Sequence, residues 1–151
     1  ENARMYKGYE QLRAQVFAIR DRLNRMGKQI TPSHNDLVAA NLVKDGDGRL
    51  YLIDWEYAGK NDPMFDIAAL FLENDFAPED EELFFHYYFK EGENLDAARE
   101  KILIFKISQD FLWSIWTVLK EARGDDFGSY GKARFDRCRR LCAQYWEIYG
   151  G

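Results

Sequence analysis

The sequence predicts an α+β fold that is mainly helical and contains one small β-hairpin. Near the N-terminus, apolar residues recur at alternating steps of four and three, the spacing of one face of a helix: Met5, Tyr9, Leu12, Val16, Ile19, Leu23 and Met26. Two short β-prone runs, 42–44 and 50–53, flank two Asp-Gly pairs at 45–48. Asp-Gly accepts the positive φ that tight hairpin turns require, so these runs are expected to pair.

Helix-ending and helix-starting residues divide the rest of the chain. The first helix is expected to end at Gly27, and its 3.5-residue repeat favours a packed helix over a coiled coil because it spans only about three heptads. Pro63 suits a first helical turn, either Asn94 or Asp96 can cap a long helix, and Gly124 can end it. Further helices are expected over 63–73, 80–91, about 94–123 and 132–149.

Size and composition narrow the class of protein. A chain of 151 residues with 46% hydrophobic content predicts a single domain over 1–151. The net charge of −5 argues against nucleic acid as a partner. We expect no membrane partner and a cytoplasmic protein, because no uninterrupted apolar stretch approaches roughly 18 residues and no signal peptide is recognisable. Cys138 and Cys142 are expected to be packed, reduced thiols rather than zinc ligands.

The segment His34-Asn35-Asp36 through Asn41, followed after the hairpin by Ile53-Asp54-Trp55-Glu56, contains three oxygen-bearing side chains suited to phosphoryl transfer. The hairpin returns the chain so that Asn41 and Asp54 can face one point, with Asp36 on the preceding loop. Phosphoryl transfer needs Mg²⁺ held against the phosphates and a carboxylate that orients the attacking hydroxyl. Asn41 and Asp54 offer the oxygen ligands that Mg²⁺ prefers, and Asp36 is then the expected base.

These segments, with Phe65-Asp66-Ile67-Ala68, resemble the choline/ethanolamine kinase family, including its bacterial choline kinase branch. The resemblance implies the C-terminal lobe of a protein-kinase-like fold, with ATP as co-substrate and Mg²⁺ as cofactor. It also implies that Asp36 is the catalytic base, that Asn41 and Asp54 bind magnesium, and that Asp66 is a buried acid bracing the catalytic loop. His34 is expected to pack and hydrogen-bond rather than transfer protons.

The acceptor is suggested by aromatic residues late in the chain. Trp113 and Trp116 are three apart on one helical face, an arrangement that is also common in protein cores. By the same resemblance, Trp113, Trp116 and Tyr130 match residues that surround a quaternary ammonium, and Glu73 matches an acid near that cation. A trimethylammonium group has no N–H donors and is best held by aromatic faces, which favours choline over ethanolamine weakly. Glu73 is equally compatible with a solvated residue at a helix end.

Three alternatives remain open. Aminoglycoside phosphotransferases have a similar loop, but they tend to line the acceptor site with acids rather than paired tryptophans. A non-catalytic module that binds quaternary amines is opposed by the intact Asp36, Asn41 and Asp54. A helical interaction protein with a chance motif would place these three side chains apart.

A complete enzyme of this type is expected to begin with a β-rich lobe carrying a phosphate-covering loop and a phosphate-contacting lysine. The chain shows no glycine-rich loop after a strand, and its first 26 residues are predicted to be the helix that follows the lobe junction. We therefore expect a fragment that lacks the ATP-binding lobe, that exposes apolar surface, and that is inactive in isolation.

Overall fold

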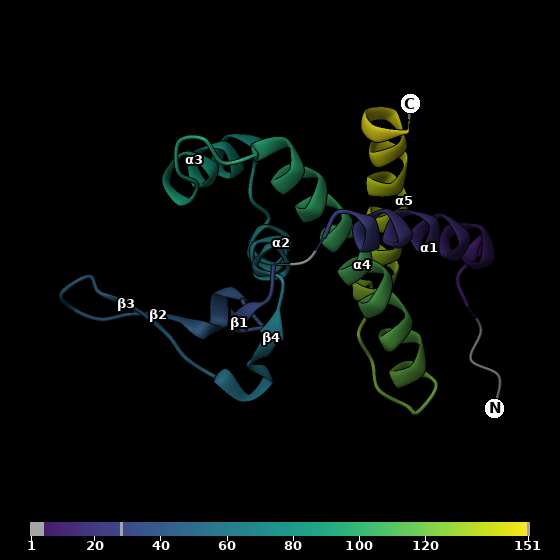
Figure 1. Cartoon of the computed structure of the whole chain (residues 1–151). Coiled ribbons are helices and arrows are strands. Elements are labelled where there is room, and N and C mark those ends of the chain that lie inside the picture. The colour runs from purple at the N-terminus through teal and green to yellow at the C-terminus, as the bar shows by residue number, and fades with distance from the viewer. Residues whose placement is uncertain (1–4, 28, 151) are drawn as a thin grey trace. The chain divides into compact units, whose positions relative to one another are not determined.

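The computed structural model describes residues 5–27 and 29–150 and divides the chain into two compact units. One unit comprises the chain up to Gly27 and from Leu103 onward, and the other comprises the intervening segment up to Ile102. Figure 1 shows the elements, which are α1 (Tyr9–Arg25), β1 (Thr31–Ser33), β2 (Leu42–Lys44), β3 (Leu50–Leu52), β4 (Gly59–Asn61), α2 (Pro63–Glu73), α3 (Pro78–Tyr88), α4 (Leu95–Glu121) and α5 (Tyr130–Tyr149). The described residues also contain 3₁₀ turns at Ala39–Asn41 and Trp55–Tyr57. The mainly helical α+β prediction is confirmed.

The unit that contains the chain ends is built on the apolar stripe of α1. Leu12, Val16, Ile19 and Leu23 are buried and pack into one cluster with apolar residues of α4 and α5. Those partners are Leu103, Ile104, Ile107, Phe111, Phe135, Cys138, Cys142 and Tyr145. The helix begins at Tyr9 rather than at Met5, because Gly8 has a left-handed backbone (φ 84°) that interrupts the helical conformation.

The other unit contains the predicted hairpin and a second sheet that the sequence did not indicate. Strands β2 and β3 pair antiparallel with Leu42 opposite Leu52 and Lys44 opposite Leu50, which confirms the hairpin. Strands β1 and β4 pair antiparallel with Thr31 opposite Asn61. This second pair escaped prediction because Thr-Pro-Ser and Gly-Lys-Asn show neither apolar alternation nor β-branched enrichment.

Helix α2 starts where β4 ends, and Asp62 fixes that junction. Its carboxylate caps the helix by accepting the Met64 N–H at 3.1 Å, and it also accepts from Lys101 Nζ at 2.8 Å. Asp62 is 3% exposed, so the ion pair with Lys101 compensates a buried charge. At the start of α4, Asn94 Oδ1 accepts the Ala97 N–H at 3.1 Å, so Asn94 is the cap of the long helix.

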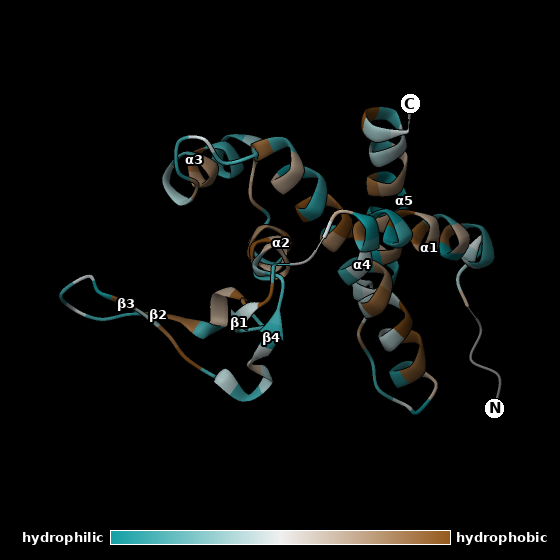
Figure 2. Cartoon of the chain, in the orientation of Figure 1, coloured by the Kyte–Doolittle hydropathy of each residue, from teal (hydrophilic) through white to brown (hydrophobic). Residues whose placement is uncertain are grey.

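Helix α4 is long and apolar enough to cross a membrane by length and composition, but 61% of its most apolar window is buried within the protein. Apolar and polar residues alternate along its ribbon in Figure 2. This pattern is that of an amphipathic helix, and its burial shows that its apolar residues serve the core of the protein.

Candidate active site

The loop between β1 and the first 3₁₀ turn is held by the side chain of Asp66. The Asp66 Oδ2 atom accepts the backbone N–H of His34 at 2.7 Å, and Oδ1 accepts that of Asn35 at 2.8 Å. Asn35 has a left-handed backbone (φ 65°), a conformation that residues other than glycine seldom adopt. Asp66 lies in the first turn of α2. The family resemblance implied a buried acid, but Asp66 is only half-buried.

His34 joins this loop to the end of β3. Its imidazole is 2% exposed, and its Nδ1 atom accepts the Asp36 N–H at 3.3 Å. The proton must therefore be on Nε2, which lies 2.8 Å from the carbonyl oxygen of Ile53 and donates to it. Trp55 packs against the imidazole edge-to-face with ring centroids 4.8 Å apart. Both ring nitrogens are engaged, so His34 is placed to support the loop.

Asn41 orients the carboxylate of Asp36. Its Nδ2 atom donates to the carbonyl oxygen of Asp36 at 2.9 Å and to Oδ2 of the same residue at 3.1 Å. The side-chain oxygen of Asn41 receives no hydrogen bond from the described residues, and no fully buried polar atom among them lacks a partner, so this oxygen keeps some exposure although Asn41 as a whole is buried. The amide thus directs its nitrogen to Asp36 and offers its oxygen to a ligand.

Asp54 lies beside Asn41 because of the hairpin register. The Ile53 N–H donates to the Asn41 carbonyl oxygen at 2.9 Å, which extends the pairing of β2 and β3 by one residue. Asp54 follows with a left-handed backbone (φ 61°, ψ 63°) and an exposed side chain. A non-glycine residue in this conformation costs free energy, and such residues cluster at functional sites.

The donors of this site fit magnesium. Among the described residues no group of three or more His, Cys, Asp or Glu side chains is arranged to hold a metal ion. Mg²⁺ is usually bound by one or two carboxylates, with water and substrate phosphates as its other ligands. The Asn41 amide oxygen and the Asp54 carboxylate match that sparse set of oxygen donors.

The aromatic residues proposed for the acceptor lie in the unit that contains the chain ends. Trp113 and Trp116 meet edge-to-face with ring centroids 5.5 Å apart, and Trp116 packs on Phe127 at 5.1 Å. The Tyr130 N–H donates to the Phe127 carbonyl oxygen at 3.1 Å. Phe127 therefore connects Trp116 with Tyr130, a role the sequence did not indicate because Phe127 lies in a loop without periodicity.

The predicted site residues fall into two sets, one in each unit. His34, Asp36, Asn41 and Asp66 are linked by hydrogen bonds, and Asp54 joins them through Ile53. Trp113, Trp116 and Tyr130 belong to the aromatic cluster of the other unit. Glu73 ends α2 as a half-buried residue in the same unit as His34, Asp36, Asn41, Asp54 and Asp66.

Comparison with known proteins identifies the family. The profile of the choline/ethanolamine kinase family matches residues 3–138. Protein LicA of Haemophilus influenzae strain Rd is 36% identical over 117 residues, covering 74% of this chain and 43% of that protein. The crystal structure of choline kinase LicA from Streptococcus pneumoniae superposes with a TM-score of 0.85 at 44% identity, covering 96% of this chain and 51% of that one.

A crystal structure of LicA in complex with AMP superposes with a TM-score of 0.82 at 45% identity, covering 93% of this chain and 48% of that one. The chain thus spans about half the length of these relatives. The predicted kinase-type fold and family are both confirmed: the chain belongs to the choline/ethanolamine kinase family.

Proposed function

We propose that this chain supplies the base, the magnesium ligands and the acceptor pocket for ATP-dependent phosphoryl transfer to the hydroxyl of choline or a related amino alcohol. The observation that carries the proposal is the 3.1 Å hydrogen bond from Asn41 Nδ2 to Asp36 Oδ2. It fixes a carboxylate next to an amide whose oxygen is available to a metal. Membership of a kinase family supports the reaction class.

Asp36 is assigned as the base. Asn41 engages Oδ2, whereas Oδ1 accepts no hydrogen bond from the described part of the chain. Oδ1 is therefore the atom we assign to the acceptor hydroxyl, whose proton it takes as the oxygen attacks phosphorus. Kinase sites need little more from the protein than such positioning together with charge stabilisation.

Asn41 and Asp54 are assigned as the residues that would hold magnesium. When bound, the ion offsets the negative charge of the ATP phosphates during transfer. Asp54 is presented at the end of β3 by its left-handed backbone, and the pairing of Ile53 with Asn41 keeps both residues at one end of the hairpin. His34 and Asp66 support this arrangement through hydrogen bonds to the backbone.

The acceptor cation is assigned to Trp113, Trp116 and Tyr130, with Glu73 adding attraction through its charge. Each aromatic face contributes about 0.5 to 2 kcal/mol to binding a cation, and more when the cation carries no strongly hydrated N–H groups. This preference supports choline over ethanolamine as the acceptor. Because the chain spans about half the length of its relatives, we assign the remaining contacts to ATP to polypeptide outside it. We also assign a cytoplasmic location, on the sequence argument alone.

The proposal is tested by ADP release from the longest natural polypeptide that contains this sequence, with Mg-ATP and choline, ethanolamine or an aminoglycoside in separate reactions. We expect choline-dependent release that Asp36→Asn lowers by at least about a thousandfold, since it removes the proton acceptor. Asp47→Asn, an exposed change in the hairpin loop, is the matched control and should retain activity. Equal rates for the two variants would refute the role of Asp36, and release with the aminoglycoside alone would refute the acceptor.

The 151-residue chain is the second sample in this experiment. We expect it to release no ADP above background, because the assigned residues include none that cover the nucleotide phosphates. Robust turnover by this chain would contradict that expectation.

A further inference from the structure

We propose that a buried ion cluster formed by Asp110, Arg134 and Arg137 positions the ring of Tyr130 for the acceptor cation. Arg134 is the positioning residue, and Asp110 fixes its guanidinium and offsets its charge. The inference rests on the proposed function, because it concerns the same acceptor pocket. It adds a support for Tyr130 that the assignment of the pocket does not include.

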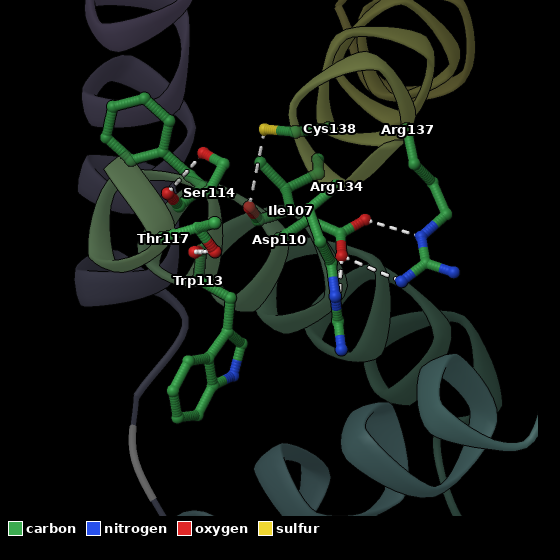
Figure 3. Close-up of polar contacts among 9 residues, drawn as sticks. Ile107, Asp110, Trp113, Ser114, Thr117, Arg134, Arg137 and Cys138 are labelled. Carbon is green, nitrogen blue, oxygen red and sulfur yellow. Dashed lines mark hydrogen bonds and ion pairs between the residues drawn. The ribbon is translucent and has the colours of Figure 1, made fainter. Parts of the chain in front are cut away.

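The cluster joins α4 to α5 inside one unit, as Figure 3 shows. Asp110 is completely buried, and its Oδ1 atom accepts from Arg134 Nη1 at 2.9 Å. Arg137 donates to the same carboxylate twice, from Nε to Oδ2 at 2.7 Å and from Nη2 to Oδ1 at 2.8 Å. A carboxylate this deeply buried is retained only where it is paired, and here both of its oxygens are engaged.

Arg134 connects this cluster to Tyr130. The residue is 4% exposed, and its guanidinium carbon lies 4.9 Å from the centroid of the Tyr130 ring one helical turn earlier. Tyr130 as a whole residue remains 39% exposed. Arg134 thus covers one side of the ring while solvent reaches another, and the buried end of Arg134 cannot move without breaking its bond to Asp110.

The backbone beside Tyr130 is fixed as well. A Cβ atom at Gly131 would lie 2.7 Å from Cβ of Thr117 and 2.5 Å from the hydroxyl of Tyr6, so α5 approaches its neighbours closely at this residue. Thr117 in turn donates its hydroxyl to the carbonyl oxygen of Trp113 at 2.8 Å. The start of α5 therefore has little freedom to slide along the helix that carries both tryptophans.

Charge gives Asp110 a second role. An unpaired guanidinium behind the Tyr130 ring would repel a quaternary ammonium bound in front of it. The carboxylate of Asp110, 2.9 Å from Arg134 Nη1, offsets that positive charge. The ring then keeps a rigid, flat support without losing its attraction for a cation.

Arg137 provides a matched control. It binds the same carboxylate as Arg134 but is seven residues beyond Tyr130, two helical turns or about 10 Å along α5. Replacing either arginine by lysine keeps the charge and loses the planar fork. Only the change at 134 removes the group that stacks on Tyr130.

The test uses the 151-residue chain with ¹³C-labelled tyrosine rings, in which the Tyr130 signal is assigned from Tyr130→Phe, and a titration with choline chloride followed by tryptophan fluorescence. We expect Arg134→Lys to shift the Tyr130 ring signal and to raise the choline Kd about tenfold, whereas Arg137→Lys does neither. Asp110→Asn should act as Arg134→Lys does. In a Tyr130→Leu background, Arg134→Lys should cause no further loss of affinity.

Urea unfolding of each variant separates positioning from stability. Arg134→Lys and Arg137→Lys should both lower the free energy of unfolding, so a general loss of stability would affect them alike. An unchanged Tyr130 signal in Arg134→Lys, or equal shifts in both variants, would overturn the inference; if Arg134→Lys does not fold, Arg134→Gln is compared with Arg137→Gln. If the unmodified chain shows no choline response while the ring signal still follows Arg134, the acceptor assignment fails and the positioning inference holds.

Discussion

Asp66 and His34 are joined by a 2.7 Å hydrogen bond from the His34 backbone N–H to Asp66 Oδ2, while the other oxygen of Asp66 accepts from Asn35. A carboxylate that accepts hydrogen bonds from two adjacent N–H groups holds the backbone of those two residues, and with it the start of the loop, in one position. The carboxylate sits in the first turn of α2, where the helix dipole also favours negative charge.

Replacing this carboxylate by an amide should loosen the loop. In Asp66→Asn one side-chain oxygen can accept one N–H, whereas the NH₂ group opposes the other donor. We expect the free energy of unfolding to fall by about 2 kcal/mol in urea titrations. Asp47→Asn, on the exposed hairpin loop, should change it by less than about 0.5 kcal/mol. Similar losses in both variants would show that Asp66 does not support the loop.

The buried imidazole of His34 makes a second prediction. His34→Phe keeps an aromatic ring but leaves the Ile53 carbonyl and the Asp36 N–H without their partner. We expect a loss of about 2 to 3 kcal/mol in the free energy of unfolding and faster hydrogen exchange at the Asp36 amide. His86→Phe, an exposed change on α3, is the control. Unchanged exchange at Asp36 would contradict the role assigned to the imidazole.

Gly131 should tolerate no side chain. A Cβ atom there would meet Thr117 and the Tyr6 hydroxyl at 2.5 to 2.7 Å, far inside van der Waals contact. We expect Gly131→Ala to lower the melting temperature, with a cost of about 1 to 3 kcal/mol for the overpacked contact. Gly46→Ala, where nothing lies within 4 Å and φ is not positive, should be close to neutral. A neutral Gly131→Ala would mean that the two helices are not in close contact at this residue.

Tyr6 should make the protein sensitive to alkali. Burial, assisted by the charges of Glu121 and Asp136, raises the pKa of the Tyr6 phenol above its usual value of 10.0. A raised pKa in the folded state means that the stabilising contribution is fully present below pH 10 and is lost as pH rises through the folded pKa. Stability between pH 9 and 12 should therefore fall less steeply in Tyr6→Phe than in Tyr87→Phe, whose ring is 79% exposed. Identical slopes would contradict this prediction.

The two thiols should be unreactive in the folded chain. Cys138 and Cys142 are fully buried on α5. The Cys138 thiol donates a hydrogen bond to the Cys142 sulfur, and this bond, together with burial, raises the pKa of Cys138. Because the thiolate is the reactive form, we expect Ellman's reagent to label neither thiol in buffer and both in 6 M guanidinium. Rapid labelling of the folded chain would show that α5 opens readily.

Local rules predicted the elements whose signals are contained in one stretch of sequence. The stripe of α1, the Asp-Gly hairpin, the Pro63 start of α2 and the Asn94 cap of α4 each depend on residues a few positions apart. The pairing of Thr31–Ser33 with Gly59–Asn61 depends instead on residues about 30 positions apart, and neither strand has an apolar face to identify it.

The site shows the same division. The residue types and their order indicated Asp36, Asn41 and Asp54, since the chemistry of phosphoryl transfer selects those side chains. The tautomer of His34 and the bridging position of Phe127 follow only from three-dimensional contacts. The stacking of Arg134 on Tyr130 could not be predicted from the sequence either, because it depends on the buried Asp110 that holds the Arg134 guanidinium.

The loop around Asp36 is anchored largely through main-chain atoms: the N–H groups of His34 and Asn35, the carbonyl oxygens of Asp36 and Ile53, and the pairing of Ile53 with Asn41. Main-chain atoms are the same whatever side chain they carry. Evolutionary drift at positions such as Leu37, Val38 and Ala40 can therefore proceed while the geometry persists. Distant relatives would then share only a few isolated identical residues with this chain. Those residues would identify the site better than the overall percentage of sequence identity does.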